Sequence, residues 1–319
     1  MKAAIVRQAG TTPVYGDFAD PVPADGDVRI AVTASALSPL VKGRAAGTHY
    51  SANNAFPFIA GVDGVGRRED GQRVYFILPS APYGSMAETA VVPASHCVAV
   101  PGALDDVAAA ALANPGMSSW AALTERARFK SGDAVLINGA TGAAGSLAVQ
   151  IARHLGARRI IATGRNPKIL QSLGADATIP LVEDRAALEA AFREHFARGI
   201  DVVLDYLWGP SAECFLAAAA KSGRPAAPVR IVQIGSASGA NIALPGALLR
   251  SAAIELMGSG IGSVSLPRLL AAIGEMLLAA GPAKFAIATR SLPLVQVDDA
   301  WGKDTGVPRL VFTIGRSGL

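Results

Sequence analysis

Cysteine is scarce in this sequence, because only Cys97 and Cys214 occur among 319 residues. Two isolated thiols exclude the disulfide framework of a small secreted domain and the cysteine cluster of a structural zinc site. Charged residues make up 17% and aromatic residues 6%, against 51% hydrophobic residues. Because so little charge is incompatible with an intrinsically disordered chain, we expect a globular protein. The two isolated cysteines are compatible with a reducing compartment.

Long apolar runs and runs of like charge are missing as well. The uncharged stretch 134–152 is interrupted by Asn138, Thr141 and Gln150, which argues against a membrane helix. The start, "MKAAIVRQAG", has an apolar run too short for a signal peptide. The formal net charge is +4, but the basic residues are scattered, which favours small anionic ligands over nucleic acid. We expect a cytoplasmic protein with no nucleic-acid and no membrane partner.

The pattern of apolar and turn-forming residues changes along the chain. Short apolar strands separated by Gly, Pro and Asp predict a β domain at the start. The alanine-rich stretch 105–129 is typical of a helix capped by Asp105 or Asp106 and broken at Pro115. From Asp133 onward apolar strands alternate with helical segments, which predicts a doubly wound parallel sheet. Segments near the end return to a β-type pattern and are expected to rejoin the first domain.

A glycine-rich turn, "GATGAAG" at 139–145, follows a strand and opens a helix. In a dinucleotide-binding turn the second glycine admits the pyrophosphate and the third lets helix and strand pack closely. Gly142 and Gly145 occupy these places, Ala140 takes the first, and Gly139 supplies turn freedom one residue earlier. The helix that follows would present free N–H groups to a diphosphate.

The next strand lacks the acid that would bind the ribose hydroxyls of NAD and repel a 2′-phosphate. It ends instead in Gly164, Arg165 and Asn166, with Lys168 a turn further on. Gly164 leaves room, Arg165 can bind a phosphate with two donors, and Lys168 adds a point charge. This pattern predicts NADPH as the cofactor.

With these residues, the whole chain resembles the medium-chain dehydrogenase/reductase superfamily, in its zinc-free quinone oxidoreductase branch, the zeta-crystallin-like proteins. The segments that carry the resemblance are "GVDGVG" at Gly61, "GQRVYF" at Gly71, "YGSMAETAVVP" at Tyr83, "GMSSWAAL" at Gly116, "SGDAVLINGATGAAG" at Ser131 and "LGAD" at Leu173. The resemblance implies an α/β protein with a GroES-like substrate domain, residues 1–112 and 283–319. It also implies a Rossmann NADP-binding domain, residues 113–282, and an active site in the cleft between the two domains.

A catalytic metal is not expected. Where zinc-dependent relatives have their cysteine and histidine ligands, this sequence has "ASALSPL" and "GVDGVG". Its four histidines are scattered along the chain. The resemblance then implies direct hydride transfer from NADPH to a quinone or another activated enone, with the cofactor supplying the chemistry. It also implies a homodimer.

Relatives place an Asn and a Tyr in the segment where this chain has Ser38 and Gly43. Tyr50 is therefore our candidate catalytic residue, with His49 as the alternative proton donor or oxygen anchor. The resemblance and the glycine turn together predict the cofactor-binding residues Ser38, Asn114, Ser118, Thr141, Gly142, Ala143, Ala144, Gly145, Gly164, Arg165, Asn166, Lys168, Leu207, Gly235, Ser236, Gly258, Ser259 and Lys303.

Two alternatives stay open at this stage. Related reductases act on enoyl thioesters, which would require a longer basic channel for the acyl carrier. The other alternative is a non-enzymatic NADPH-binding protein, because some zeta-crystallin relatives serve as lens or RNA-binding proteins. The loss of the family Asn and Tyr is compatible with that role. The sequence leaves the physiological acceptor, the proton donor and the oligomeric interface open.

Overall fold

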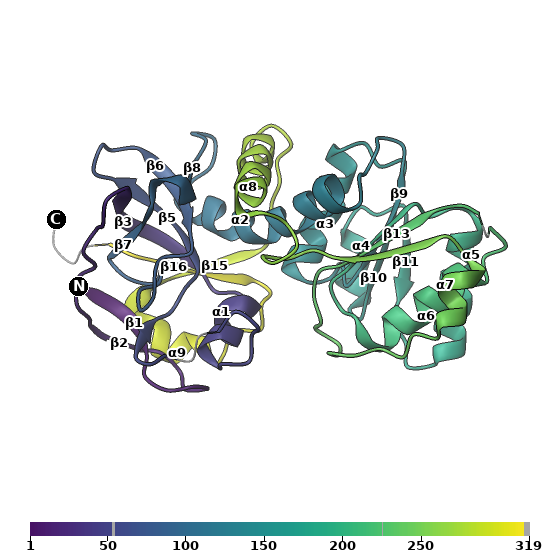
Figure 1. Ribbon diagram of the computed structural model, residues 1–319, viewed down its shortest axis with the longest axis horizontal. Coiled ribbons are helices and arrows are strands. Elements are labelled where there is room, and N and C mark those ends of the chain that lie inside the picture. The colour runs from purple at the N-terminus through teal and green to yellow at the C-terminus, as the bar shows by residue number, and fades with distance from the viewer. Residues whose placement is uncertain (53–54, 225, 316–319) are drawn as a thin grey trace. The chain divides into compact units, whose positions relative to one another are not determined.

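We describe a computed structural model that covers residues 1–52, 55–224 and 226–315. Contacts divide the chain into two compact units, of which unit 1 is Met1–Asn114 with Ile273–Leu319 and unit 2 is Pro115–Ala272. Strands from the two ends of the sequence, purple and yellow in Figure 1, therefore belong to the same unit. In the part of the chain that the structure covers, no helix is long and apolar enough to cross a membrane.

Two sheets form the β part of unit 1. The larger has the order β15-β16-β3-β5-β6-β8, with β7 also paired to β3, and the smaller has the order β2-β1-β4. The strands are β1 (Lys2–Val6), β2 (Val14–Asp17), β3 (Asp27–Ala36), β4 (Phe58–Ile59), β5 (Asp63–Arg68), β6 (Arg73–Ile77), β7 (Thr89–Pro93), β8 (Cys97–Ala99), β15 (Thr289–Pro293) and β16 (Arg309–Thr313). Because β16 pairs with β3, the end of the chain completes the sheet begun near its start, as the sequence predicts.

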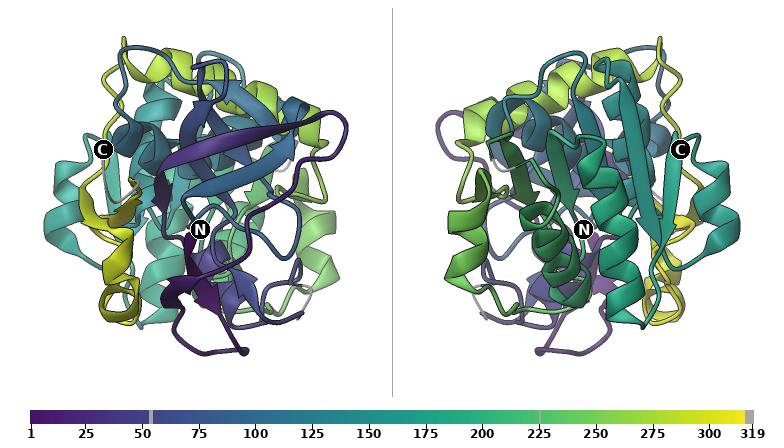
Figure 2. Two further views of the ribbon diagram at one scale, coloured as in Figure 1. Left: turned by 90° about the vertical axis from the view of Figure 1, so that its left-hand side faces the viewer. Right: turned by 90° about the vertical axis from the view of Figure 1, so that its right-hand side faces the viewer.

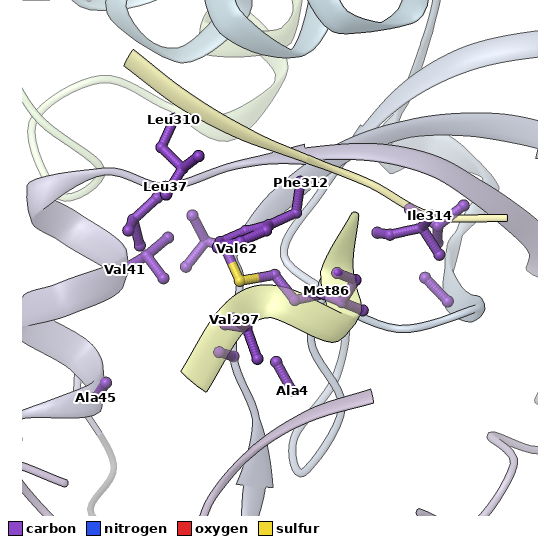
Figure 3. Packing of buried hydrophobic residues seen from close by; sticks show 14 of the residues in the cluster. Ala4, Leu37, Val41, Ala45, Val62, Met86, Val297, Leu310, Phe312 and Ile314 are labelled. Atoms are coloured by element: carbon purple, nitrogen blue, oxygen red, sulfur yellow. The ribbon is translucent and has the colours of Figure 1, made fainter. Parts of the chain in front are cut away.

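The core of unit 1 lies against these strands and holds helix α1 (Pro39–Ala45) in place. Figure 3 shows Val41 and Ala45 of α1 in the same cluster as Val62, Met86 and Phe312. The helix begins at Ser38, whose Oγ accepts a hydrogen bond from the Val41 N–H, and a proline fits its first turn. Besides these core residues, α1 carries the basic residues Lys42 and Arg44 in its last turn.

Two helices form where the sequence predicted otherwise. Pro115 lies inside α2 (Asp106–Ala121) and does not break it, because burial on both sides outweighs the roughly 3 kcal/mol cost of an internal proline. Near the end of the chain, α9 (Val297–Trp301) replaces the expected strand, after a 3-10 turn (Leu294–Gln296). Two aspartates in its first turn favour the helix, and Val297 and Trp301 are buried.

Unit 2 contains a six-stranded parallel sheet with the order β11-β10-β9-β12-β13-β14. The strands are β9 (Ala134–Asn138), β10 (Arg159–Gly164), β11 (Ala177–Pro180), β12 (Val202–Asp205), β13 (Val229–Gln233) and β14 (Ile254–Gly258). Every residue of β9 is buried, as expected for a central strand covered on both faces. The order reverses at β9, so the predicted doubly wound sheet is confirmed.

Helices lie on both faces of this sheet. They are α3 (Ala143–His154), α4 (Pro167–Ser172), α5 (Arg185–Ala197), α6 (Gly209–Ala220) and α7 (Gly246–Ser251). Leu136, Ile161 and Val203 share one core cluster with Phe192 and Phe215, which belong to α5 and α6. Helix α3 contacts β9 and β10 but takes no part in that cluster, so it covers the other face (Figure 1; right-hand view in Figure 2). Unit 2 ends within α8 (Leu266–Ala280).

Candidate cofactor site

The glycine turn between β9 and α3 contains two glycines that the fold itself requires. Gly139 has a φ of +93°, and a Cβ there would lie 2.8 Å from Cγ of Leu207. A Cβ at Gly145 would overlap the Gly139 carbonyl oxygen and lie 2.7 Å from Cα of Ala140. Helix α3 can therefore approach the strand closely only because Gly145 has no side chain, which is the role predicted for the third glycine.

Gly142 differs, because nothing in the described part of the protein requires a glycine there. Its φ of −84° suits any residue, and a Cβ would meet only the Gly139 carbonyl oxygen at 3.8 Å. Gly142 is also the N-cap of α3 and makes no side-chain capping bond. The space in front of the first α3 amides is thus open to a group that approaches the backbone closely. An anionic diphosphate fits this arrangement, since unpaired N–H groups and the helix dipole favour negative charge.

A network of buried polar side chains stabilises this glycine turn. The Asn138 side chain donates from Nδ2 to Oδ1 of Asp205 and to Oγ of Ser211, at 2.8 and 2.9 Å. Its Oδ1 accepts a bond from the Thr163 hydroxyl at 2.7 Å, and Thr163 Oγ1 accepts the Gly139 N–H. Sequence reasoning missed these residues, although a polar residue at the end of each apolar strand was a signal that could have identified them.

Asp205 also shapes the segment after β12. Its Oδ1 accepts the N–H groups of Leu207 and Trp208, both at 3.0 Å. Its Oδ2 is buried and has no hydrogen-bond partner in the described part of the chain. Burial raises the pKa of Asp205, against the hydrogen bonds that favour its charged form. The carboxyl group therefore acts as a structural acceptor for the segment that follows β12.

The end of β10 presents two unpaired cations. Arg165 and Lys168 are exposed, and neither has an ion-pair or hydrogen-bond partner among residues 1–52, 55–224 and 226–315. Asn166 caps α4, since its Oδ1 accepts the Ile169 N–H at 3.2 Å. The room expected beside Gly164 is filled by Thr141, whose Cβ would lie 3.1 Å from a Cβ at residue 164. Arg165 and Lys168 are thus available to an anionic ligand, but that ligand cannot enter the space between Thr141 and Gly164.

The other predicted residues of unit 2 lie at or just after the carboxyl ends of parallel strands, apart from Ser118 in α2. They are Leu207 after β12, Gly235 and Ser236 after β13, and Gly258 and Ser259 at the end of β14. Gly235 approaches the chain closely, because a Cβ there would lie 2.7 Å from the Tyr206 carbonyl oxygen. The Ser118 hydroxyl donates to the Pro115 carbonyl at 2.7 Å. The structure thus brings the strand-end residues to one edge of the sheet.

The remaining predicted residues belong to unit 1. Ser38 is buried and acts as the N-cap of α1, whereas Asn114 is half-buried in α2 and Lys303 is exposed. Tyr50 is 74% exposed, and its ring lies 4.2 Å from that of His49. A Cβ at Gly43 would lie 3.2 Å from Cβ of His49, so the histidine occupies space next to this position.

A buried charge cluster in unit 1 was also missed by the sequence analysis. The Tyr75 hydroxyl donates to Oδ2 of Asp63 at 3.0 Å, and Arg309 interacts electrostatically with both. Burial raises the pKa of Asp63 to about 6, against the opposing effect of Arg309. Nε and Nη2 of Arg309 have no partner in the described part of the chain.

The structure shows no metal centre in the residues it covers. No group of three or more His, Cys, Asp and Glu side chains there could hold an ion. Cys97 and Cys214 are both free thiols, and burial raises the pKa of each.

Comparison with known proteins identifies the family. The sequence-family model described as zinc-binding dehydrogenase matches residues 143–275 of this chain. A probable NADPH-dependent quinone reductase, tdiC, of Emericella nidulans is 30% identical over 362 residues, covering 98% of this chain and 99% of the relative. A trans-enoyl reductase, pgmF, of Aspergillus terreus is 28% identical over 168 residues, covering 52% of this chain and 45% of the relative.

The fold comparison agrees. The quinone oxidoreductase of Thermus thermophilus, solved alone and with NADPH, has a TM-score of 0.80 and 25% identity, covering 98% of this chain and 99% of that one. The chain belongs to the medium-chain dehydrogenase/reductase superfamily, in its quinone oxidoreductase branch. The predicted fold class and family are therefore confirmed.

Proposed function

We propose that this protein is an NADPH-dependent oxidoreductase that transfers a hydride to a quinone or another activated enone without a metal ion. The observation that carries the proposal is the end of β10, where two unpaired cations of the described chain replace the acid that NAD-binding strands carry. The relative from Emericella nidulans, similar along nearly its whole length, supports it through its description as an NADPH-dependent quinone reductase.

The residues of unit 2 fit this cofactor. The first turn of α3, left open at Gly142, would hold the pyrophosphate, and Arg165 with Lys168 would bind the 2′-phosphate. The strand-end residues Leu207, Gly235, Ser236, Gly258 and Ser259 would line the remainder of the nucleotide, and Ser38, Asn114, Ser118 and Lys303 are proposed to complete its contacts. When bound, NADPH supplies the hydride.

Tyr50 is the proposed proton donor to the acceptor oxygen. The Tyr50 side chain is exposed, and the ring of His49 packs against its ring. Tyr50→Phe should lower kcat with a neutral quinone and leave NADPH binding unchanged. Tyr15→Phe is the matched control. Equal kcat values for both variants would remove Tyr50 from the mechanism.

The test of the function follows the absorbance of NADPH with the purified full chain. We expect oxidation of NADPH with small quinones, and far slower oxidation of NADH. Tight NADPH binding with no turnover on any quinone, enal or enoyl thioester would instead identify a non-enzymatic NADPH-binding protein.

Enoyl thioester reduction is the second candidate, because a trans-enoyl reductase is similar over half of this chain. The same assay with a crotonyl thioester decides between the two. A higher kcat/KM for the thioester than for any quinone would favour the second candidate.

We further propose a cytoplasmic homodimer. The two free cysteines are compatible with a reducing compartment. Strand β14 is the last strand of its sheet, and Leu256 on it is 36% exposed, so its unpaired edge is suited to a second copy. Sedimentation equilibrium should then report twice the chain mass of 32.5 kDa.

A further inference from the structure

Tyr206 carries a buried hydroxyl group that none of the roles above uses. The residue follows β12 directly, and its backbone N–H donates to the Asn138 carbonyl oxygen at 3.1 Å. A Cβ at Gly139, in the glycine turn, would lie 3.4 Å from Cβ of Tyr206. The tyrosine therefore lies beside the glycine turn, at the carboxyl edge of the parallel sheet.

The order of the strands assigns Tyr206 to one half of the proposed cofactor site. Dinucleotides bind across the point where the strand order reverses, which is β9 in this sheet. The cations proposed for the 2′-phosphate follow β10, so the adenosine half belongs on that side of β9. Strand β12 is the neighbour of β9 on the other side. The nicotinamide half should then run over the end of β12, where Tyr206 is found.

The hydroxyl of Tyr206 lacks a hydrogen-bond partner. Its oxygen is buried, and no donor or acceptor of residues 1–52, 55–224 and 226–315 completes a bond with it. Burial raises the pKa of Tyr206 to about 12, and the nearby hydroxyls of Ser118 and Ser119 oppose that rise. The phenol therefore keeps its proton at pH 7 and is a neutral donor without an acceptor. An unsatisfied buried hydroxyl costs free energy that a new hydrogen bond would reduce.

The two serines of α2 differ in what they can offer to Tyr206. Both hydroxyl hydrogens are engaged within the helix, that of Ser118 by the Pro115 carbonyl at 2.7 Å and that of Ser119 by the Gly116 carbonyl at 3.2 Å. Both oxygens therefore have lone pairs left but no spare hydrogen. Ser119 is fully buried, whereas Ser118 is half-buried. Of the two, Ser118 is the one that can contact Tyr206 and a bound ligand together.

We propose that Tyr206 is a positioning residue for the nicotinamide of NADPH and acts through Ser118. The Tyr206 hydroxyl donates to Oγ of Ser118, whose own hydrogen stays on the Pro115 carbonyl. Ser118 is then an acceptor only, and it accepts an N–H of the nicotinamide carboxamide. An amide held in this way orients the ring from which the hydride leaves. The inference rests on the proposed function and adds a residue to its site.

Calorimetry on the full chain tests the proposal with three oxidised cofactors. NADP⁺ has the carboxamide, the thionicotinamide analogue keeps its N–H groups, and the acetylpyridine analogue has a methyl group in their place. Tyr206→Phe should weaken the binding of NADP⁺ and of the thionicotinamide analogue by about threefold to tenfold, as for one lost neutral hydrogen bond. It should leave the affinity for the acetylpyridine analogue unchanged.

Ser118→Ala should give the same selective loss, and adding Tyr206→Phe to it should cause no further loss, because the tyrosine acts through that oxygen. Ser251→Ala and Tyr83→Phe are the matched controls. The Ser251 hydroxyl also donates to the carbonyl three residues before it, at 3.1 Å, and the Tyr83 hydroxyl donates to a backbone carbonyl at 3.3 Å. Neither control should change the affinity for any of the cofactors.

Thermal melting gives a second readout that does not depend on activity. Tyr206→Phe removes a hydroxyl without a partner, so its Tm without cofactor should equal or exceed that of the wild type. A fixed excess of NADP⁺ should then raise the Tm of Tyr206→Phe less than that of the wild type. A hydroxyl that served only the fold would show the reverse, a lower Tm without cofactor and an equal gain with it.

Three results would overturn the proposal and leave the proposed function intact. They are equal losses of affinity for NADP⁺ and the acetylpyridine analogue in Tyr206→Phe, no loss for either, and a double variant that binds NADP⁺ more weakly than Ser118→Ala. Binding of NADP⁺ by the wild type is measured in the same series. Its absence would show that the proposed function itself fails, and this proposal would fail with it.

Discussion

Arg165 and Lys168 follow β10 at the place where an acid would select NAD, and both are exposed and unpaired in the described part of the chain. Thr141 fills the space over Gly164, so a 2′-phosphate would have to be bound by these long side chains rather than by a pocket beside the glycine. The preference for NADPH is therefore expected to depend on charge more than on shape, and to weaken with salt.

Arg165→Asp tests this preference. The change removes a charge-assisted contact and adds a repulsive carboxylate, so NADPH affinity should fall by about 1.5–3 kcal/mol. NADH affinity should change little, because NADH has no 2′-phosphate. Titration of both cofactors measures the ratio, and Arg193→Asp on α5 is the control with the same charge change. Equal losses for NADPH and NADH would show that Arg165 does not contact the phosphate.

Asp205 is a residue whose two oxygens have different surroundings. Oδ1 accepts three hydrogen bonds, whereas Oδ2 accepts none within the described residues. Asp205→Asn keeps the acceptor, so its free energy of unfolding at neutral pH should lie within about 1 kcal/mol of the wild type. Asp205→Ala leaves buried donors unpaired and should cost about 3 kcal/mol or more. Denaturant unfolding of both variants checks the difference, and equal values would contradict this account.

The same residue predicts a pH dependence. The pKa of Asp205 is raised above 3.8 in the folded chain, so the folded state holds the proton more tightly than the unfolded chain. Its contribution to stability is complete below that value and is lost as pH rises through the folded pKa. Asp205→Asn should therefore gain stability relative to the wild type over this rise, as unfolding measured from pH about 3 upward would show. A constant difference across the range would refute the raised pKa.

At the scale of elements, the glycines of the strand-turn-helix unit from β9 to α3 have different structural roles. Gly139 and Gly145 allow the turn and the close packing of α3, whereas Gly142 leaves space that no atom of the described residues fills. Substituting single glycines of this turn by alanine should therefore affect stability at one position and ligand binding at another.

Gly145→Ala and Gly142→Ala form a matched pair. Gly145→Ala should lower the free energy of unfolding by about 1–3 kcal/mol, because its Cβ overlaps the Gly139 carbonyl. Gly142→Ala should leave stability unchanged or raise it by up to about 1 kcal/mol, yet weaken NADPH binding. Unfolding curves and cofactor titration measure the two effects. Unchanged NADPH affinity in Gly142→Ala would mean that the pyrophosphate does not approach this residue.

For the whole molecule, the proposed chemistry depends on the cofactor and on no metal. Dialysis against a chelator should leave NADPH affinity, quinone turnover and thermal stability unchanged, and elemental analysis should find no stoichiometric zinc. Loss of turnover that returns on adding zinc would contradict the proposed mechanism.

Family and fold class could be predicted from the sequence because they depend on local patterns. Buried strands such as β9 are continuous apolar runs, and the glycine turn has a fixed spacing between strand and helix. Helices through Pro115 and at Val297–Trp301 could not be predicted, since burial against distant strands outweighed local propensity there.

The sequence by itself determined the doubly wound sheet, the glycine turn and the cationic end of β10, because each depends on residues close together in the chain. Only the tertiary structure decided that Asn138, Thr163 and Asp205 share one buried network. Partners in such contacts lie far apart in sequence and meet only when strands and helices pack, so no local pattern encodes them.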